Sequence, residues 1–452
     1  MGRCPGCGEW NSLEASALPR GGVSGPGAGA ADEGSATDGP RRLADVDPDG
    51  ARPVPTGLGE VDRVLGGGLV PGSATLLFGE PGTGKSTLLL QVLAAAAVGE
   101  AALLVSAEES AAQVRARAAR LGSLPDRLLV HATTDLDDAE AAVVATGARL
   151  VVVDSVHTLA DGELPAPPGS LAQVRSAADR LARLARRTRA AVVLVGHVTK
   201  EGGPAGPRAL EHLVDTVVCL EGDRYHRLRL LRALKHRFGS TGEVGMFEMS
   251  PGGLRAVPDP GALVLGDRLG DVPGSAVAPL LEGSRPVLVE LQVLACSGAG
   301  GAGRRNVQGL DPRRVATVAA VLECRAGVGL GDLELFFSAV GGLRVGEPAA
   351  DLPLALALAS AVAGYPLPGG LVAFGEVGLA GELRQVPGAD RRLAEAARLG
   401  FGRAVVPART PPGPPGMDVL AVGSLAEAVA AAYRPVRRPD RSSAPPALVD
   451  AG

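Results

Sequence analysis

The stretch that decides the fold is residues 73–87, SATLLFGEPGTGKST. Its first six residues are mostly apolar and typical of a buried strand, and the next eight fit the pattern G-x-x-x-x-G-K-[ST], after which an apolar helical stretch begins. In this setting the backbone N–H groups of the loop surround a chain of phosphates at the positive end of the helix. The sequence therefore predicts an ATP site in which Lys85 reaches the outer phosphates and the Ser86 hydroxyl holds Mg²⁺. The predicted binding residues are Gly79, Glu80, Pro81, Gly82, Thr83, Gly84, Lys85, Ser86 and Thr87.

The surrounding region repeats the alternation of strand and helix. Strand-like apolar runs at 101–106, 149–154 and 190–197 alternate with helical stretches, and residues 170–187 place their apolar side chains on one face and their arginines largely on the other. Such alternation indicates a parallel sheet covered by helices. We therefore expect an α/β domain over residues 51–255.

Three acidic residues are candidates for hydrolytic chemistry. Asp154 ends a buried apolar run, where a carboxylate can hold Mg²⁺ or its water beside the phosphate loop. Glu108 and Glu109 follow an earlier run, and either carboxylate could orient a water molecule against the γ-phosphate of ATP. His197 and Thr199 lie where the fourth strand ends, so they could respond to the state of the nucleotide.

Composition separates further regions. A break rich in proline and glycine at 251–261 precedes a second α/β region, residues 256–435. Its apolar stretch 352–364 is shorter than the roughly 20 residues of a membrane helix and is interpreted as a buried helix. Residues 16–50 are poor in large apolar side chains and predict a flexible linker, and residues 436–452 predict a disordered tail.

Charge and cysteine content restrict the partners and the compartment. The 45 lysines and arginines against 49 aspartates and glutamates give a net charge of -4, which excludes a chain that holds nucleic acid through overall positive charge. An aromatic content of 2% argues against base stacking as the main way of holding single strands. Five cysteines form no disulfide framework, and the N-terminal residues lack the apolar core of a secretory signal, so we expect a cytoplasmic protein.

A local basic patch lies at residues 225–239, YHRLRLLRALKHRFG. A cluster of this kind can serve the phosphates of a neighbouring subunit's nucleotide or of a DNA backbone, or it can be a solvated edge strand. Periodicity alone does not choose between these interpretations. The patch contains Arg227, Arg229, Arg232, Lys235, His236 and Arg237.

Taken together, these motifs resemble the bacterial RadA (Sms) family of DNA-repair ATPases. The resemblance rests on an ordered series of segments: GEPGTGKST (79–87), LLVSAEES (103–110), VVVDSVHTL (151–159), LVGHVTKEG (194–202) and LKHRFGST (234–241). It implies a RecA-like motor core followed by a domain similar to that of Lon protease. It also implies a homo-oligomer, a hexameric ring, that acts on single-stranded and branched DNA in recombinational repair beside a RecA-type recombinase.

The family's hallmark pentapeptide is Lys-Asn-Arg-Phe-Gly, and here it reads Lys235-His236-Arg237-Phe238-Gly239. The resemblance implies that Lys235 and Arg237 act across a subunit interface or couple DNA binding to ATP turnover. Histidine replaces asparagine at position 236, so the resemblance assigns that residue no role.

The N-terminal residues depart from the family pattern. The family begins with a zinc finger of four cysteines, and residues 1–15 keep only Cys4 and Cys7. Tetrahedral zinc needs four ligands, and the next cysteine is Cys219, so the site cannot close locally. We expect either that the true reading frame begins upstream of Met1 or that this chain has lost its finger.

The second domain departs from the protease pattern. Lon-like proteolysis uses a Ser–Lys dyad, but Ala349 stands at the serine position and Asp390 at the lysine position. We therefore expect no peptide hydrolysis, and we interpret the domain as a scaffold for assembly or DNA binding. Arg391 and Arg392 are its candidate phosphate contacts.

The leading interpretation is a DNA-dependent ATPase that drives branch migration and strand extension as a ring-shaped motor. One alternative is a nucleotide-gated scaffold that binds DNA without moving along it, since both functions need the same phosphate pocket. Another alternative is an ATP-dependent protease, but the absence of the Ser–Lys dyad argues against it.

Overall fold

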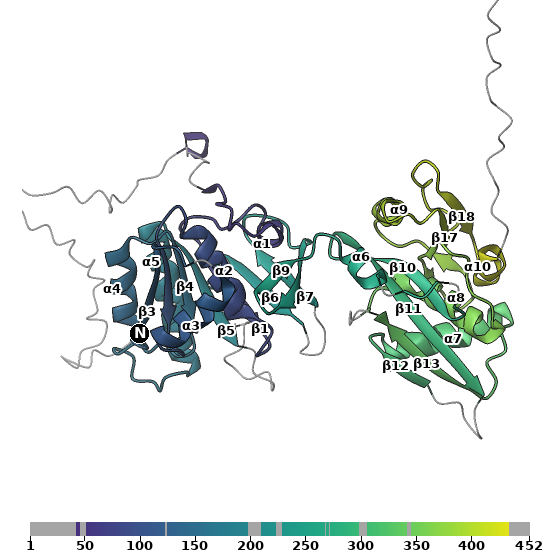
Figure 1. Ribbon diagram of the computed structural model, residues 1–452, viewed down its shortest axis with the longest axis horizontal. Coiled ribbons are helices and arrows are strands. Elements are labelled where there is room, and N and C mark those ends of the chain that lie inside the picture. Colours follow the sequence, from purple (N-terminus) through teal and green to yellow (C-terminus); the bar gives the residue numbers. More distant parts are fainter. Residues whose placement is uncertain are drawn as a thin grey trace, which may run out of the picture. The chain divides into compact units, whose positions relative to one another are not determined.

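The computed structural model describes residues 42–45, 51–122, 124–197, 209–222, 228–266, 268–270, 272–297, 305–340 and 345–433. Two large sheets each form the centre of an α/β domain (Figure 1). The zinc-finger remnant with Cys4 and Cys7, most of the linker, the tail, Thr199 and Arg227 lie outside the described residues. The boundary at 255/256 stays a prediction.

The first domain contains a nine-stranded sheet in the order β3-β2-β4-β5-β1-β6-β7-β8-β9. Strands β1 to β6 pair in parallel, and β7 to β9 continue the sheet in antiparallel pairs. The four predicted strands are present with their starts one residue later than expected. The sequence did not predict β3, a half-buried strand at the sheet edge with a weak apolar pattern. The strands are β1 (Ala74–Gly79), β2 (Ala102–Ser106), β3 (Leu128–Ala132), β4 (Leu150–Asp154), β5 (Ala191–His197), β6 (Thr216–Glu221), β7 (Leu228–His236), β8 (Val244–Ser250) and β9 (Gly253–Ala256).

Helices cover both faces of this sheet, as predicted. Helices α4 (Leu136–Thr146) and α5 (Leu171–Thr188) pack on one face. Helices α1 (Gly59–Val64), α2 (Lys85–Ala96) and α3 (Ala111–Leu121) pack on the other. Alternate residues of a strand point to opposite faces, so Leu76 of β1 joins the first core and Leu77 joins the second. A short 3-10 turn, η1 (Leu43–Asp45), precedes the domain in the chain.

The second domain is built on a seven-stranded sheet in the order β12-β13-β11-β10-β14-β17-β18, with a separate ribbon of β15 and β16. Its helix α8 (Asp351–Ala363) is the predicted buried helix, and its first ten residues are all buried. No helix in the described part of the chain is long and apolar enough to span a membrane. The other elements are β10 (Ser275–Glu282), β11 (Arg285–Ser297), β12 (Arg305–Gln308), β13 (Leu333–Ala339), β14 (Leu371–Ala373), β15 (Glu376–Val377), β16 (Leu383–Arg384), β17 (Arg403–Pro407), β18 (Asp418–Val422), α6 (Pro260–Leu265), α7 (Pro312–Ala326), η5 (Pro348–Ala350), α9 (Ala389–Arg398) and α10 (Leu425–Ala432).

Arg392 belongs to the core of the second domain. Its side chain has no exposed surface, pairs with Glu347, and donates hydrogen bonds to the carbonyl oxygens of Pro279 at 2.8 Å and Pro387 at 3.0 Å. The prediction that Arg392 contacts DNA phosphate is therefore wrong, because its donors are engaged inside the domain. Its neighbour Arg391 is exposed and stays a candidate.

Removing Arg392 takes the cationic partner from Glu347 and opens a cavity. We expect Arg392→Ala to lower the free energy of unfolding of the second domain by about 3–5 kcal/mol. Arg391→Ala is the matched control and changes this free energy by less than about 0.5 kcal/mol. Thermal unfolding followed by circular dichroism compares both variants with the wild type. Equal midpoints for the two variants would contradict the placement of Arg392 in the core.

Candidate nucleotide site

The loop after β1 folds around the side chain of Lys85. Lys85 is buried, and its Nζ donates hydrogen bonds to the carbonyl oxygens of Gly79 at 2.8 Å and Glu80 at 3.0 Å. The Thr83 hydroxyl donates to the same Glu80 carbonyl at 2.9 Å. Residues 80–82 at the top of the loop are exposed. The backbone of residues 80–82 is thus accessible while the Lys85 ammonium group is buried, an arrangement that suits a phosphate site.

The backbone conformation at position 84 explains why a glycine precedes Lys85. Gly84 adopts a φ of +105° at the N-cap of α2, a left-handed backbone that side chains disfavour. A Cβ at this position would also lie 2.6 Å from the Cε of Met249. Both observations explain why the pattern requires glycine at position 84.

The predicted acidic residues lie at the same end of the sheet as Lys85. In the parallel pair β2–β4, Ser106 lies opposite Asp154, and the Ala107 N–H donates to the Asp154 carbonyl at 2.8 Å. Burial lowers the pKa of Lys85, and the charges of Asp154 and, less strongly, Glu108 oppose that shift. Both carboxylates therefore act on this ammonium group.

The two adjacent glutamates have different partners. Glu108 accepts a hydrogen bond from the buried Ser155 hydroxyl at 2.5 Å. Glu109 instead forms an ion pair with Arg117 of α3. The two carboxylates that the sequence left as alternatives therefore have different surroundings: that of Glu108 contacts the residue after Asp154, and that of Glu109 contacts α3.

Arg229 and Arg232 of the basic patch are engaged within the chain. Arg229 is buried in β7, and its Nε donates to the Thr83 carbonyl at 3.2 Å, so it supports the nucleotide loop. The sequence left open whether Arg229 serves phosphate or belongs to a solvated edge strand, and the structure instead buries it against the nucleotide loop. Arg232 forms an ion pair with Glu221 at 3.0 Å.

Lys235 and Arg237 lie at the opposite end of the sheet from the nucleotide loop. Arg237 pairs with Asp215 at 2.9 Å, and the other Asp215 oxygen accepts the N–H of Ala74, the first residue of β1. Lys235 donates to the Val214 carbonyl at 2.9 Å. The nucleotide loop follows the other end of β1, about 17 Å away at about 3.3 Å per residue. Within one chain, these two cations do not reach that loop.

His236 lies between Lys235 and Arg237 in the sequence and contacts Thr216. Its Nδ1 lies 3.0 Å from the Thr216 hydroxyl oxygen, and burial lowers its pKa below the usual value of histidine. Because the ordinary value is about 6.5, the imidazole is neutral at pH 7. His236 therefore adds no charge to the patch at neutral pH.

Comparison with known proteins identifies the family. Residues 41–203 match a family model described as an AAA domain. The chain is 45% identical to the DNA repair protein RadA of Mycolicibacterium smegmatis, over 95% of this chain and 93% of that protein. The chain belongs to the RadA family of DNA repair proteins. The RadA of Mycobacterium tuberculosis strain H37Rv is 44% identical over 95% and 89% of the two chains, and the RadA of Pseudomonas aeruginosa is 44% identical over 96% and 95%.

A solved structure gives a weaker likeness. A KaiC-like protein from Pyrococcus horikoshii OT3 is 22% identical, covers 46% of this chain and 100% of its own, and has a TM-score of 0.39. This likeness is too low to add to the RadA assignment.

The residues at the RadA nucleotide loop fit ATP and magnesium. Mg²⁺ prefers oxygen ligands, takes one or two carboxylates and keeps several waters, and the Ser86 hydroxyl and Asp154 carboxylate supply such donors. Within the described ranges no group of three or more histidine, cysteine or acidic residues forms a further metal site.

Ser155 and the supporting role of Arg229 were not predicted from the sequence. Ser155 directly follows Asp154 in the RadA motif VVVDSVHTL, and this position was the available signal. Nothing in the sequence distinguishes the buried Arg229 from the half-buried Arg232 and Lys235 of the same strand, because its burial depends on how β7 packs beside the nucleotide loop.

Proposed function

We propose that this chain is a DNA-dependent ATPase of recombinational repair that processes branched DNA as a hexameric ring-shaped motor, with a RecA-type recombinase as partner. The observation that carries the proposal is the placement of Lys85, Asp154 and Glu108 at one end of the sheet in a chain of the RadA family. Single-stranded and branched DNA are the proposed substrates of the motor.

Each residue of the proposed site has one task. Bound ATP with Mg²⁺ supplies the γ-phosphoryl group and the charge neutralisation that its transfer requires. Loop N–H groups of residues 79–87 and the Lys85 ammonium hold the phosphates, and Ser86 and Asp154 hold the metal. Glu108 orients the attacking water and accepts its proton. Glu109 takes no part, because its carboxylate is paired with Arg117.

The two glutamates can be separated by matched substitutions. We expect Glu108→Gln to lower kcat for ATP hydrolysis by about 100-fold or more, because an amide cannot accept the proton of water. Glu109→Gln loses only a part-exposed ion pair and changes kcat by less than about 2-fold. Steady-state phosphate release measures both, and nucleotide binding confirms that each variant still holds ATP. The reverse ranking would transfer the role to Glu109.

Lys235 and Arg237 fit the proposal only through a second copy of the chain. In the register of the sheet they lie toward the start of β1, whereas the nucleotide loop of their own subunit follows its end. We therefore propose that they contact the nucleotide of the adjacent subunit in the ring, where a cation supplied from outside stabilises the charge of the transferring phosphoryl group. The net charge of -4 is compatible with DNA binding if basic loops line the channel of that ring.

Arg237 can be tested against a similar surface ion pair. We expect Arg237→Ala to abolish stimulation of ATP hydrolysis by single-stranded DNA, lowering the stimulated rate by about 10³-fold, while ATP still binds. Arg183→Ala removes an equally long exposed pair with Asp179, 2.9 Å, and leaves stimulation within about 2-fold of wild type. A stimulated rate that Arg237→Ala leaves unchanged would contradict the proposed role.

Motion along DNA separates the motor from a nucleotide-gated scaffold. We expect the wild type to move the branch of a synthetic three-way junction with ATP but not with a non-hydrolysable analogue. Glu108→Gln should bind the junction and fail to move its branch. Binding without movement by the wild type would favour the scaffold. Proteolysis is the weakest alternative, because Ala349 at the expected nucleophile position is fully buried.

A further inference from the structure

Ser155 is the residue after the strand β4, and it makes one short contact with the proposed site. Its side chain has no exposed surface, and its hydroxyl donates to the Oε1 atom of Glu108 at 2.5 Å. This distance lies at the short end of the range for a hydroxyl bonded to an ionised carboxylate. Glu108 itself is exposed, and this contact favours the rotamers that keep its carboxylate next to Ser155.

The proton of Ser155 is available for this hydrogen bond. The nearest other hydroxyl, that of Thr158, lies 3.5 Å away and donates its own proton to the Ser155 carbonyl at 2.8 Å. A hydroxyl carries a single proton. The Thr158 proton therefore points at the backbone, and the Ser155 proton points at Glu108.

The backbone holds both partners of the contact. The Ala107 N–H donates to the Asp154 carbonyl at 2.8 Å, and these two residues directly precede Glu108 and Ser155 in the chain. The Val156 N–H donates to the Val195 carbonyl at 3.1 Å, one step after Ser155. Ser155 is thus fixed from both sides and cannot follow Glu108 if that side chain rotates away.

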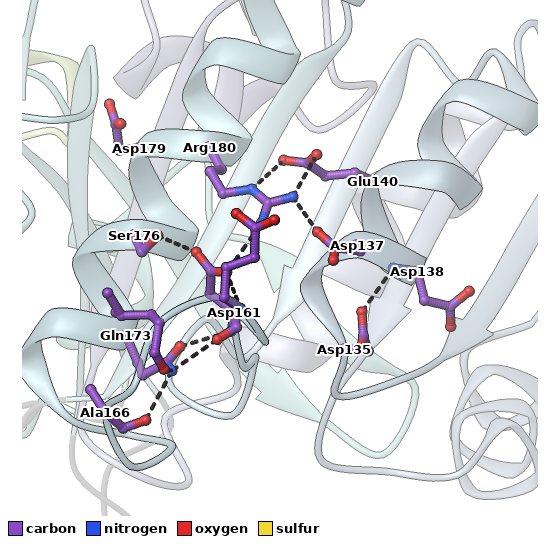
Figure 2. A network of polar contacts seen from close by, with 12 residues as sticks. Asp135, Asp137, Asp138, Glu140, Asp161, Ala166, Gln173, Ser176, Asp179 and Arg180 are labelled. Atoms are coloured by element: carbon purple, nitrogen blue, oxygen red, sulfur yellow. Dashed lines mark hydrogen bonds and ion pairs between the residues drawn. The ribbon is translucent and has the colours of Figure 1, made fainter.

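The segment that continues from Ser155 is anchored to α5. The buried Gln173 carboxamide accepts the Asp161 N–H at 2.7 Å and donates to the carbonyl oxygens of Asp161, Leu164 and Ala166 at 3.1, 3.1 and 2.9 Å (Figure 2). One side chain therefore contacts four backbone groups of the segment, and one of its two amide protons is shared between two carbonyl oxygens. These contacts join the segment that follows Ser155 to α5.

A second serine–carboxylate contact lies in the same network. Ser176 of α5 donates to the Asp161 carboxylate at 2.6 Å, and the Arg180 guanidinium lies 3.4 Å from the same carboxylate (Figure 2). Ser176 lies in α5, and its partner Asp161 belongs to the segment that Gln173 holds. Ser176 therefore offers a serine–carboxylate hydrogen bond of nearly the same length whose acceptor is Asp161 and not Glu108.

We propose that Ser155 is a positioning residue for ATP hydrolysis, whose hydroxyl selects the orientation of the Glu108 carboxylate that receives the proton of the attacking water. The inference rests on the proposed function, since it needs Glu108 as the group that orients water. It assigns Ser155 no contact with the nucleotide. Its loss should therefore affect the chemical step and leave nucleotide affinity unchanged.

The test compares two serine substitutions in two backgrounds, with steady-state ATP hydrolysis by the full chain and binding of a fluorescent ATP analogue. We expect Ser155→Ala to lower kcat about 10-fold or more, the effect of losing one hydrogen bond to a charged group, with KM and analogue affinity within about 2-fold of wild type. Ser176→Ala should leave kcat within about 2-fold. Ser155→Thr, which keeps the hydroxyl, should recover most of the loss.

The second background is Glu108→Gln. If Ser155 acts through Glu108, adding Ser155→Ala lowers the residual kcat by less than about 2-fold, because effects on one functional unit are not additive. An equal loss in both backgrounds, a loss matched by Ser176→Ala, or an unchanged kcat would overturn the inference. Full activity in Glu108→Gln alone would instead overturn the proposed role of Glu108. The two failures are therefore distinguishable.

Discussion

The direction of each strand decides which residues of the first domain lie together at one end of its sheet. Parallel strands end at the same edge of a sheet, so β1, β2 and β4 bring the nucleotide loop, Glu108 and Asp154 together although they lie far apart in sequence. β7 runs antiparallel to β6, so Lys235 and Arg237 lie toward the opposite end of the strands. One reversal of chain direction therefore separates the phosphate-binding lysine from the cations of the pentapeptide, and any joint action requires two subunits.

Two buried arginines form their hydrogen bonds inside the fold. Arg229 supports the nucleotide loop through the Thr83 carbonyl, and Arg392 joins Glu347 inside the second domain. Burying an arginine is unfavourable unless its donors are satisfied, and each of these side chains meets backbone carbonyl oxygens. Glu347 lies two residues before Ala349, so a partly buried ion pair lies close in sequence to the position where the resemblance places a Lon-like nucleophile.

The sequence was sufficient for the elements whose pattern is local. Strands β1, β2, β4 and β5, helix α5, the buried helix α8 and the nucleotide loop follow from apolar periodicity and one motif. The sequence could not distinguish Glu108 from Glu109, because the difference depends on Ser155 and Arg117, which come from other elements. It also offered Arg392 as a candidate phosphate contact and left the role of Arg229 open, because the sequence does not show whether the side chain of a cation is solvated or buried. The missing information in each case is which distant residues pack around the side chain.

The two cations of the pentapeptide differ in how readily they can leave their own subunit. The Arg237 side chain is 54% exposed and has an ion pair with Asp215, and exposed pairs of this kind contribute only about 0–1 kcal/mol. Asp215 keeps the Ala74 N–H as a donor when that pair breaks. Lys235 is half-buried and donates to two backbone carbonyls, those of Glu211 at 2.5 Å and Val214 at 2.9 Å. In the proposed ring, Arg237 is therefore the cation that can turn toward a neighbouring nucleotide at little cost, and Lys235 is the one that holds the strand end in place while it does so.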